Sequence, residues 1–212
     1  MNPDRWKFTQ EYSQEVFGVQ DDHLAGLMER ATAAGLPPIA VSADVGRLLQ
    51  ILVSMTSGMR ALELGTLAGY SAIWIARGLQ PDGRLTTIEY ETSQAEVARA
   101  EREAAGVAGR VDLVEGAARD VRPGLAAEWG DASVDFGFIA AVKSEYVASL
   151  DELKPLMGPG GLLVADNVYG TGAGWIDEGH GTDEFNRRLA GDPDFEAVAV
   201  PLREGVLISR RR

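Results

Sequence analysis

The stretch that decides the fold is Leu62-Glu-Leu-Gly-Thr-Leu-Ala-Gly-Tyr-Ser71. A short apolar run over 61–64 ends at Gly65, and a second glycine, Gly69, precedes a helix-like segment over 70–79. Strand, glycine turn and helix in this order let a nucleotide-like ligand approach bare backbone at a helix N-terminus. The sequence therefore predicts a ligand site where this strand ends.

The charge around this turn narrows the class of ligand. The glycines are spaced Gly-x-x-x-Gly after Glu63, unlike the Gly-x-Gly-x-x-Gly that seats an anionic pyrophosphate. An acidic strand end suits a ligand that carries positive charge, such as S-adenosylmethionine with its sulfonium and amino groups. Glu89 ends the next predicted strand, near the ~20-residue separation at which an acidic side chain binds ribose hydroxyls. A lone Glu there would be read as solvent-facing, but its pairing with Glu63 favours a ligand contact.

Composition limits the remaining possibilities. The chain has 212 residues, enough for one well-cored domain, and no cysteine that would form a disulfide or a thiolate metal site. A formal net charge of −12 argues against nucleic-acid binding, and the basic end, Arg210-Arg211-Arg212, is read as a solvated tail. Because there is neither an apolar run of about 20 residues nor a signal-peptide pattern, we expect no membrane association and a cytoplasmic location.

The order of the predicted elements indicates an α/β fold. Helices are predicted over 6–17, 22–34, 43–56, 70–79, 93–105, 119–128, 143–157 and 182–189, and strands over 60–64, 84–89, 110–114, 134–139, 161–166, 195–200 and 205–209. Pro159-Gly160-Gly161 is read as a tight turn into the fifth strand, and the short connection over 201–204 as an antiparallel hairpin. We expect one domain, with a helical cap over 1–58 and a Rossmann-like core over 59–212. The core has a seven-stranded, mostly parallel sheet with helices on both faces and an antiparallel last strand.

Five motifs in order carry a family resemblance: Leu62 to Ser71, Thr87-Ile-Glu-Tyr90, Val114-Glu-Gly-Ala-Ala118, Phe138-Ile-Ala-Ala-Val-Lys143 and Pro159-Gly-Gly-Leu-Leu-Val-Ala-Asp-Asn-Val168. From about Val41 onward the chain resembles the class I S-adenosylmethionine-dependent O-methyltransferases of the catechol and caffeoyl-coenzyme A type, in particular small bacterial members. The resemblance implies transfer of a methyl group from S-adenosylmethionine to a hydroxyl of a small phenolic, catechol-like acceptor. It also implies a homodimer.

The same resemblance implies a set of cofactor contacts. Ser71 would hold the methionine carboxylate in the first turn of its helix, and Glu89 would bind the ribose. Gly116, Ala117 and Ala118 would lie along the adenine. The full implied set is Val41, Glu63, Gly65, Thr66, Ser71, Glu89, Gly116, Ala117, Ala118 and Ala140.

The implied metal site is where the chain departs from the family. The family pattern Phe-Ile-Asp-Ala-x-Lys supplies an Asp that binds a divalent cation, usually Mg²⁺, and here that position is Ala140. The other two ligand positions, Asp166 and Asn167, are intact. Three alternatives stay open: a weaker cation site completed by the acceptor, a metal-free site, and an engineered replacement of Asp by Ala.

Lys143 matches the family's general base, and Asn167 is expected beside it at the acceptor. Because the loop over 169–181 directly follows the metal-ligand pair, Tyr169 and Trp175 are expected to line the acceptor pocket, where their rings can stack on a phenol. The alternative is a glycine-rich surface loop whose Trp packs on its own domain. If no metal is bound, Lys143 is expected either to act as the base or to pair with Asp166 as a protonated anchor. His180 in the loop over 169–181 is a further candidate base or ligand. The competing function is an S-adenosylmethionine-binding protein with little or no catalysis.

Overall fold

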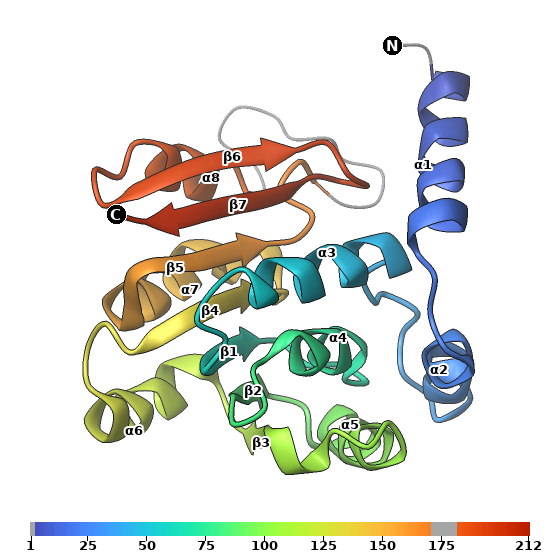
Figure 1. The fold of residues 1–212 in the computed structure, drawn as a ribbon, viewed down its shortest axis with the longest axis horizontal. Helices are drawn as coiled ribbons and strands as arrows, with labels where there is room; N and C mark the ends of the chain where they lie inside the picture. Colours follow the sequence, from blue (N-terminus) through green and yellow to red (C-terminus); the bar gives the residue numbers. More distant parts are fainter. Residues whose placement is uncertain (1–2, 171–181) are drawn as a thin grey trace.

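The computed structural model describes residues 3–170 and 182–212. Its centre is a seven-stranded sheet in the order β3-β2-β1-β4-β5-β7-β6 (Figure 1). Strands β1 to β5 are parallel to one another, whereas β7 is antiparallel to both β5 and β6. The mostly parallel sheet with an antiparallel last strand, predicted from the sequence, is confirmed.

The strands are β1 Arg60–Leu64, β2 Arg84–Glu89, β3 Val111–Glu115, β4 Val134–Ile139, β5 Met157–Ala165, β6 Phe195–Val200 and β7 Val206–Arg211. The helices of the described residues are α1 Pro3–Phe17, α2 Asp22–Ala33, α3 Ala43–Ser54, α4 Tyr70–Gly78, α5 Thr92–Ala104, α6 Ala118–Trp129, α7 Tyr146–Leu153 and α8 Asp183–Ala190. Short 3₁₀ turns lie at Ala108–Arg110, Lys143–Glu145 and Lys154–Leu156. Across the described part of the chain, each helix falls short of the length and apolarity needed to cross a bilayer.

The sheet is buried on both faces, as parallel sheets require. Ala61 and Phe138 point to the face covered by α3, α4 and α5, whereas their neighbours Leu62 and Ile139 point to the face covered by α6, α7 and α8 (Figure 1). This alternation divides the core into two apolar layers with the sheet between them. Because β1 to β5 run parallel, their last residues lie at the same edge of the sheet.

Two predicted elements differ from the structure, both around β5. The helix predicted over 143–157 is shorter, because Pro155 lacks the N–H that would continue it and the chain passes through a 3₁₀ turn. Pro159-Gly160-Gly161 lies inside β5 rather than in a turn before it. There the register with β4 jumps from Val134↔Met157 to Phe136↔Leu162, so extra residues bulge from the ladder.

The N-terminal helices are attached unequally. Side chains of α2 and α3 belong to the same apolar cluster as the sheet, whereas α1 stands at the edge of the molecule and leaves Phe8 and Tyr12 exposed (Figure 1).

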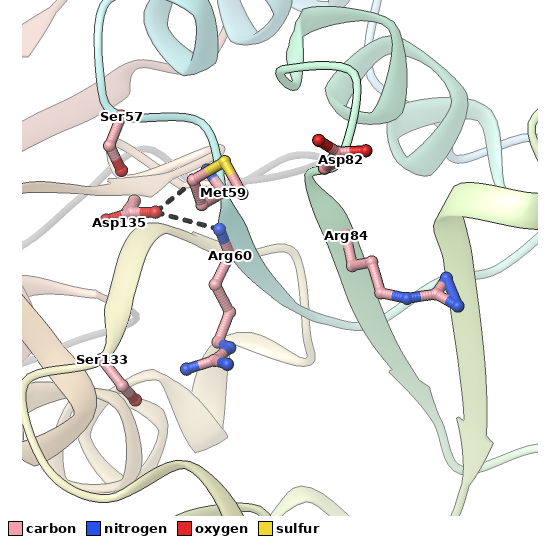
Figure 2. A pocket seen from close by; sticks show the side chains of 7 residues that line it. All are labelled: Ser57, Met59, Arg60, Asp82, Arg84, Ser133 and Asp135. Atoms are coloured by element: carbon pink, nitrogen blue, oxygen red, sulfur yellow. Dashed lines mark hydrogen bonds between the residues drawn. The ribbon is translucent and has the colours of Figure 1, made fainter.

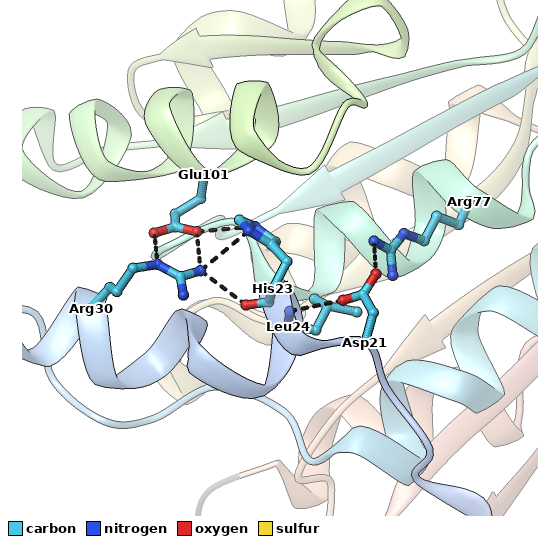
Figure 3. Close-up of polar contacts among 6 residues, drawn as sticks. All are labelled: Asp21, His23, Leu24, Arg30, Arg77 and Glu101. Carbon is cyan, nitrogen blue, oxygen red and sulfur yellow. Dashed lines mark hydrogen bonds and ion pairs between the residues drawn. The ribbon is translucent and has the colours of Figure 1, made fainter.

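Polar contacts hold α2 against the body (Figure 3). Arg30 donates to both carboxylate oxygens of Glu101 on α5, at 2.9 and 2.7 Å, and His23 lies 3.1 Å from the same carboxylate. Asp21 caps α2 at the Leu24 N–H and pairs with Arg77 of α4.

Candidate functional site

The order of the strands reverses between β1 and β4, and ligands of such sheets bind outside the carboxyl ends at this point. Gly65 follows β1 there with φ +92°, and a Cβ on it would lie 2.8 Å from the Ala140 carbonyl oxygen. Only glycine permits both this conformation and this approach. The glycine turn after β1 therefore packs against the end of β4, where the Ala140 N–H donates to the Leu64 carbonyl at 2.9 Å.

Glu89, at the end of β2, is held by backbone donors. One carboxylate oxygen accepts from the N–H groups of Thr66 and Leu67 at 3.0 and 2.8 Å, and the other accepts from Glu91 at 3.0 Å. The side chain is buried, so the solvent-facing alternative is wrong for this residue. These bonds tie the glycine turn to the predicted ribose-binding position.

Glu63 is fully buried at the carboxyl end of β1. Its Oε2 accepts from the Thr87 hydroxyl at 2.6 Å, while Oε1 has no hydrogen-bond partner among the described residues. Burial raises the pKa of Glu63 to about 7, against the lowering effect of the Ser71 and Thr87 hydroxyls. An unpaired buried acceptor is costly. It therefore marks a place for a donor, such as the amino group of the expected cofactor.

Ser71 lies in the first turn of α4, directly after Gly69, which caps the helix in a left-handed conformation with φ +83°. The free N–H groups of this turn favour an anionic group. Ser71 is buried beside the Glu63 carboxyl group. The two predicted contacts for the amino-acid end of the cofactor are therefore adjacent.

The other predicted cofactor contacts surround this centre. Thr66 is buried in the glycine turn, and Val41 is buried just before α3. Gly116 donates its N–H to the Glu89 carbonyl at 2.9 Å, and Ala117 and Ala118 form the start of α6. All these positions follow strands β1 to β3 or approach their ends, as the sequence predicts. Their contact with a cofactor stays a prediction.

The acceptor half of the site begins at Asp166 and Asn167, directly after β5. Asp166 is buried, and Asn167 has a left-handed backbone with φ +54°. Asp166 Oδ1 and Asn167 Oδ1 are both buried and find no hydrogen-bond partner in the described chain. Burial raises the pKa of Asp166, while Arg203 and Lys143 lower it. Asp166 Oδ1 and Asn167 Oδ1 are thus two buried acceptors that a ligand near Ala140 could use.

Lys143 lies in the 3₁₀ turn after β4 and reaches the same place. Its Nζ donates to the Tyr146 hydroxyl and to the Asp166 carbonyl oxygen, the latter at 3.2 Å. Desolvation lowers the pKa of Lys143 to about 8, although Asp166 raises it. A lysine with this pKa loses its proton far more readily near neutral pH than an exposed one. Its hydrogen bond goes to the Asp166 backbone, so the expected pairing with the carboxylate is not the contact that forms.

The carboxylate of Asp166 has a different partner, which the sequence analysis missed. Arg203 Nη1 lies 3.7 Å from Asp166 Oδ2, and Arg203 is carried by the connection between β6 and β7. From the sequence this connection was read only as a hairpin. The adjacent charged residues Arg203 and Glu204 in this connection were the only sequence signal of a functional role. The antiparallel register of β7 on β5 is what places them beside the end of β5.

Two aromatic residues were expected around the acceptor. Tyr169 lies against Gly205, where a Cβ would come within 2.4 Å of its ring, and its hydroxyl donates to the Ala199 carbonyl at 3.2 Å. Its ring therefore supports the hairpin. Trp175, like His180, lies outside the described residues.

One surface hollow lies at the opposite edge of the sheet (Figure 2). It has a volume of about 360 Å³ and is lined by Ser57, Met59, Arg60, Asp82, Arg84, Ser133 and Asp135, which start or precede β1, β2 and β4. Asp135 accepts there from the N–H groups of Met59 and Arg60, at 3.0 and 2.9 Å. Because this is the amino-terminal edge of the strands, it is not the predicted site.

A Rossmann-like sheet with two buried carboxylates at its switch point defines the class of nucleoside-cofactor-binding α/β proteins. Comparison with known proteins narrows this class. A profile of the O-methyltransferase family matches residues 10–212, and the chain belongs to this family. It is 36% identical to a catechol O-methyltransferase of Niastella koreensis over 95% of this chain and 93% of the relative. It is 40% identical to one of Mycobacterium tuberculosis over 85% and 82%.

Two solved structures are similar over nearly their whole length. The O-methyltransferase of Bacillus cereus in complex with S-adenosylhomocysteine (SAH) has a TM-score of 0.85 and 29% identity, covering 99% of each chain. An O-methyltransferase of Streptomyces achromogenes involved in tomaymycin synthesis, in complex with S-adenosylmethionine, has a TM-score of 0.84 and 34% identity. It covers 100% of this chain and 99% of that one. The family recognised from the motifs is therefore confirmed.

Proposed function

We propose that the protein transfers the methyl group of S-adenosylmethionine to a hydroxyl oxygen of a small phenolic, catechol-like acceptor. The observation that carries this proposal is that two sets of side chains lie at the carboxyl ends of neighbouring strands around one switch point. Glu63 and Glu89 suit the cofactor, and Lys143 and Asp166 suit an acidic hydroxyl. The relatives named for catechol methylation support the acceptor class.

The cofactor fits the residues that are present. The unpaired Glu63 Oε1 would accept from its amino group, and Ser71 with the first turn of α4 would hold its carboxylate. A carboxylate has about four acceptor positions. Backbone N–H groups fill three at Glu89, so a ribose hydroxyl has room at the fourth. When bound, the cofactor supplies an activated methyl group on sulfur.

Lys143 then acts on the acceptor. Its neutral amine would take the proton from the phenolic hydroxyl, which leaves the oxygen nucleophilic toward the methyl group that a bound cofactor would supply. The proton would then reside on Lys143. The contacts of Nζ with Tyr146 and the Asp166 carbonyl hold the amine at the strand ends. Positioning of this kind is the main contribution that a protein makes to such a displacement.

The metal implied by the family does not fit these residues well. A hard dication prefers about six oxygen ligands, and the chain offers one carboxylate and one amide beside the methyl group of Ala140. No cluster of three or more His, Cys, Asp or Glu that would hold a metal occurs within residues 3–170 and 182–212. The cations Arg203 and Lys143 are already next to Asp166. We therefore infer an impaired metal site.

Two measurements test this function. S-adenosylmethionine is titrated calorimetrically, and methyl transfer to a panel of phenols and catechols is assayed with and without EDTA. We expect binding together with turnover that EDTA changes little. Binding without turnover on the whole panel would contradict the proposal and favour a cofactor-binding protein with little catalysis. The homodimer, the cytoplasmic location and the absence of nucleic-acid partners stay predictions.

A further inference from the structure

The acceptor half of the site contains a cation that the family motifs do not include. Arg203 reaches Asp166 Oδ2 at 3.7 Å, and its side chain is only 21% exposed. Partial burial strengthens such a pair, because solvent screens it less than at the surface. The only carboxylate left at the implied metal position is thus neutralised by a side chain of the same chain.

The hairpin that carries Arg203 is fixed against the strand ends. Val168 donates to the Gly205 carbonyl at 3.0 Å, and Tyr169 donates to the Glu204 carbonyl at 2.7 Å. The ring of Tyr169 closes over Gly205. Because Val168 directly follows the Asp166-Asn167 pair, these bonds hold Arg203 in a set position relative to both residues.

Arg203 also faces the cofactor side of the site. It donates to the carbonyl of Ala40 at 3.4 Å, next to Val41, which the resemblance assigns to the cofactor. The guanidinium therefore lies between the segment before α3 and the acceptor carboxylate.

Two carboxylates flank the guanidinium of Arg203. Asp166 Oδ2 lies 3.7 Å from Nη1, and Glu204 Oε2 lies 3.3 Å from Nε. Because Lys143 is neutral when it acts as the base, Arg203 is the cation that faces Asp166 in that state.

We propose that Arg203 takes the place that the family gives to the divalent cation, binding the ionised oxygen of an ortho-diphenol while the neighbouring hydroxyl faces Lys143. This inference rests on the proposed function, since it concerns the acceptor of that reaction. The fork of N–H donors on a guanidinium suits an oxyanion that is also close to a carboxylate. The substrate class is therefore a vicinal diphenol that binds as its monoanion without a metal.

The test uses 4-nitrocatechol, whose ionisation is visible by absorbance, titrated into the full chain with S-adenosylhomocysteine and EDTA present. We expect the wild type to bind the coloured monoanion at a pH where the free probe is partly protonated. Arg203→Ala should weaken this binding by about 10- to 100-fold, the range for a hydrogen bond to a charged group. Arg203→Lys should fall between, and guanidinium chloride at millimolar concentration should restore part of the binding to Arg203→Ala.

The matched control is Arg188→Ala, because Arg188 is an arginine paired with Asp151, away from the strand ends. It should bind the probe as the wild type does. Thermal unfolding and S-adenosylhomocysteine affinity of each variant report on folding and on the cofactor half. If Arg203→Ala is unstable, the guanidinium rescue and Arg203→Lys still decide the matter.

Three outcomes overturn the inference. They are unchanged probe binding in Arg203→Ala, wild-type binding that occurs only when EDTA is left out, and binding of the probe only in its neutral form. Failure of the proposed function gives a different result, namely wild-type protein that binds S-adenosylmethionine and methylates no phenol. A wild type that binds no probe contradicts both the inference and the phenolic acceptor.

Discussion

The two halves of the site are built in different ways. In the cofactor half, Glu63 and Glu89 are each held by donors from the glycine turn or the adjacent strand. In the acceptor half, Ala140, Asp166 and Arg203 come from β4, β5 and the β6–β7 hairpin. The first half lies on two consecutive strands and follows the family motifs, whereas the second is assembled from distant segments and departs from them. The negative charge that is missing at Ala140 is therefore accompanied by a positive charge, Arg203, from another segment.

The largest effect is expected at Lys143, where the two halves meet. Lys143→Met removes the proposed base and should lower kcat by about 10²- to 10⁴-fold, the usual contribution of general base catalysis. S-adenosylmethionine affinity, measured by calorimetry, should change little. Lys154→Met is the control, because Lys154 pairs with Asp192 rather than with the site. Undiminished turnover in Lys143→Met would remove this residue from the chemistry.

A pH-dependent effect is expected from Glu63 in the cofactor half. Burial raises its pKa to about 7 from 4.5. Below about pH 4.5 the carboxyl group is neutral in both the folded and the unfolded chain, so its contribution to stability is fully present. As the pH rises through about 7, the folded protein must ionise a buried group and this stability is lost.

Glu63→Gln cannot ionise and should remove this dependence. Without cofactor, its free energy of unfolding relative to wild type should rise between pH 5 and pH 8, by up to about 3 kcal/mol. Urea unfolding at both pH values measures the difference. A difference that is the same at pH 5 and pH 8 would show that Glu63 does not titrate in this range.

Glu89→Ala tests whether the cofactor half binds ribose as the motif predicts. The variant loses one charge-assisted hydrogen bond to the ribose, which is worth about 1.5–3 kcal/mol. S-adenosylmethionine affinity should therefore fall by about 10- to 100-fold in a calorimetric titration. The exposed neighbour Glu91 provides the control variant Glu91→Ala. Equal affinity in Glu89→Ala and wild type would contradict the ribose contact.

The smallest effect is expected from restoring the family carboxylate in the acceptor half. Ala140→Asp should tighten Mg²⁺ binding and raise catechol methylation in its presence about tenfold, or about 1.4 kcal/mol. A bound cation also favours the ionised phenol, so activity should appear at lower pH. Asp166→Ala in this background should abolish the gain. An inert or harmful Ala140→Asp would contradict this prediction, because the missing carboxylate alone would then not be what keeps Mg²⁺ from binding.

Much of the fold follows from local pattern. The apolar strands and the change from strand to helix at the glycine turn after β1 are local features. Each predicted strand is present in the structure. The errors occur where local signals compete. Pro159-Gly160-Gly161 has the composition of a turn, but the pairing of Met157 and Leu162 with β4, on either side of it, keeps it inside β5 as a bulge. Turn propensity is a local preference of a few residues, and the ladder on both sides outweighs it.

The arrangement of the predicted cofactor contacts follows from the sequence because its parts are short-range. Gly65, Thr66 and Leu67 follow Glu63 directly, and parallel pairing of β1 with β2 places Glu89 beside them. The absence of a carboxylate at Ala140 is likewise visible in the sequence. The partner of Asp166 is not, because Arg203 is far along the chain and reaches it only through the antiparallel return of β7.

Residue types at close spacing are enough to predict the family, the glycine turn, the two acidic strand ends and the alanine at the family's metal-ligand position. Three features appear only in the folded chain: the unpaired oxygen of Glu63, the contact of Lys143 with the Asp166 backbone, and the pairing of Arg203 with the Asp166 carboxylate. Burial and ion pairing depend on which surfaces the folded sheet brings together. The spacing of residues within one segment does not determine how close that segment comes to another.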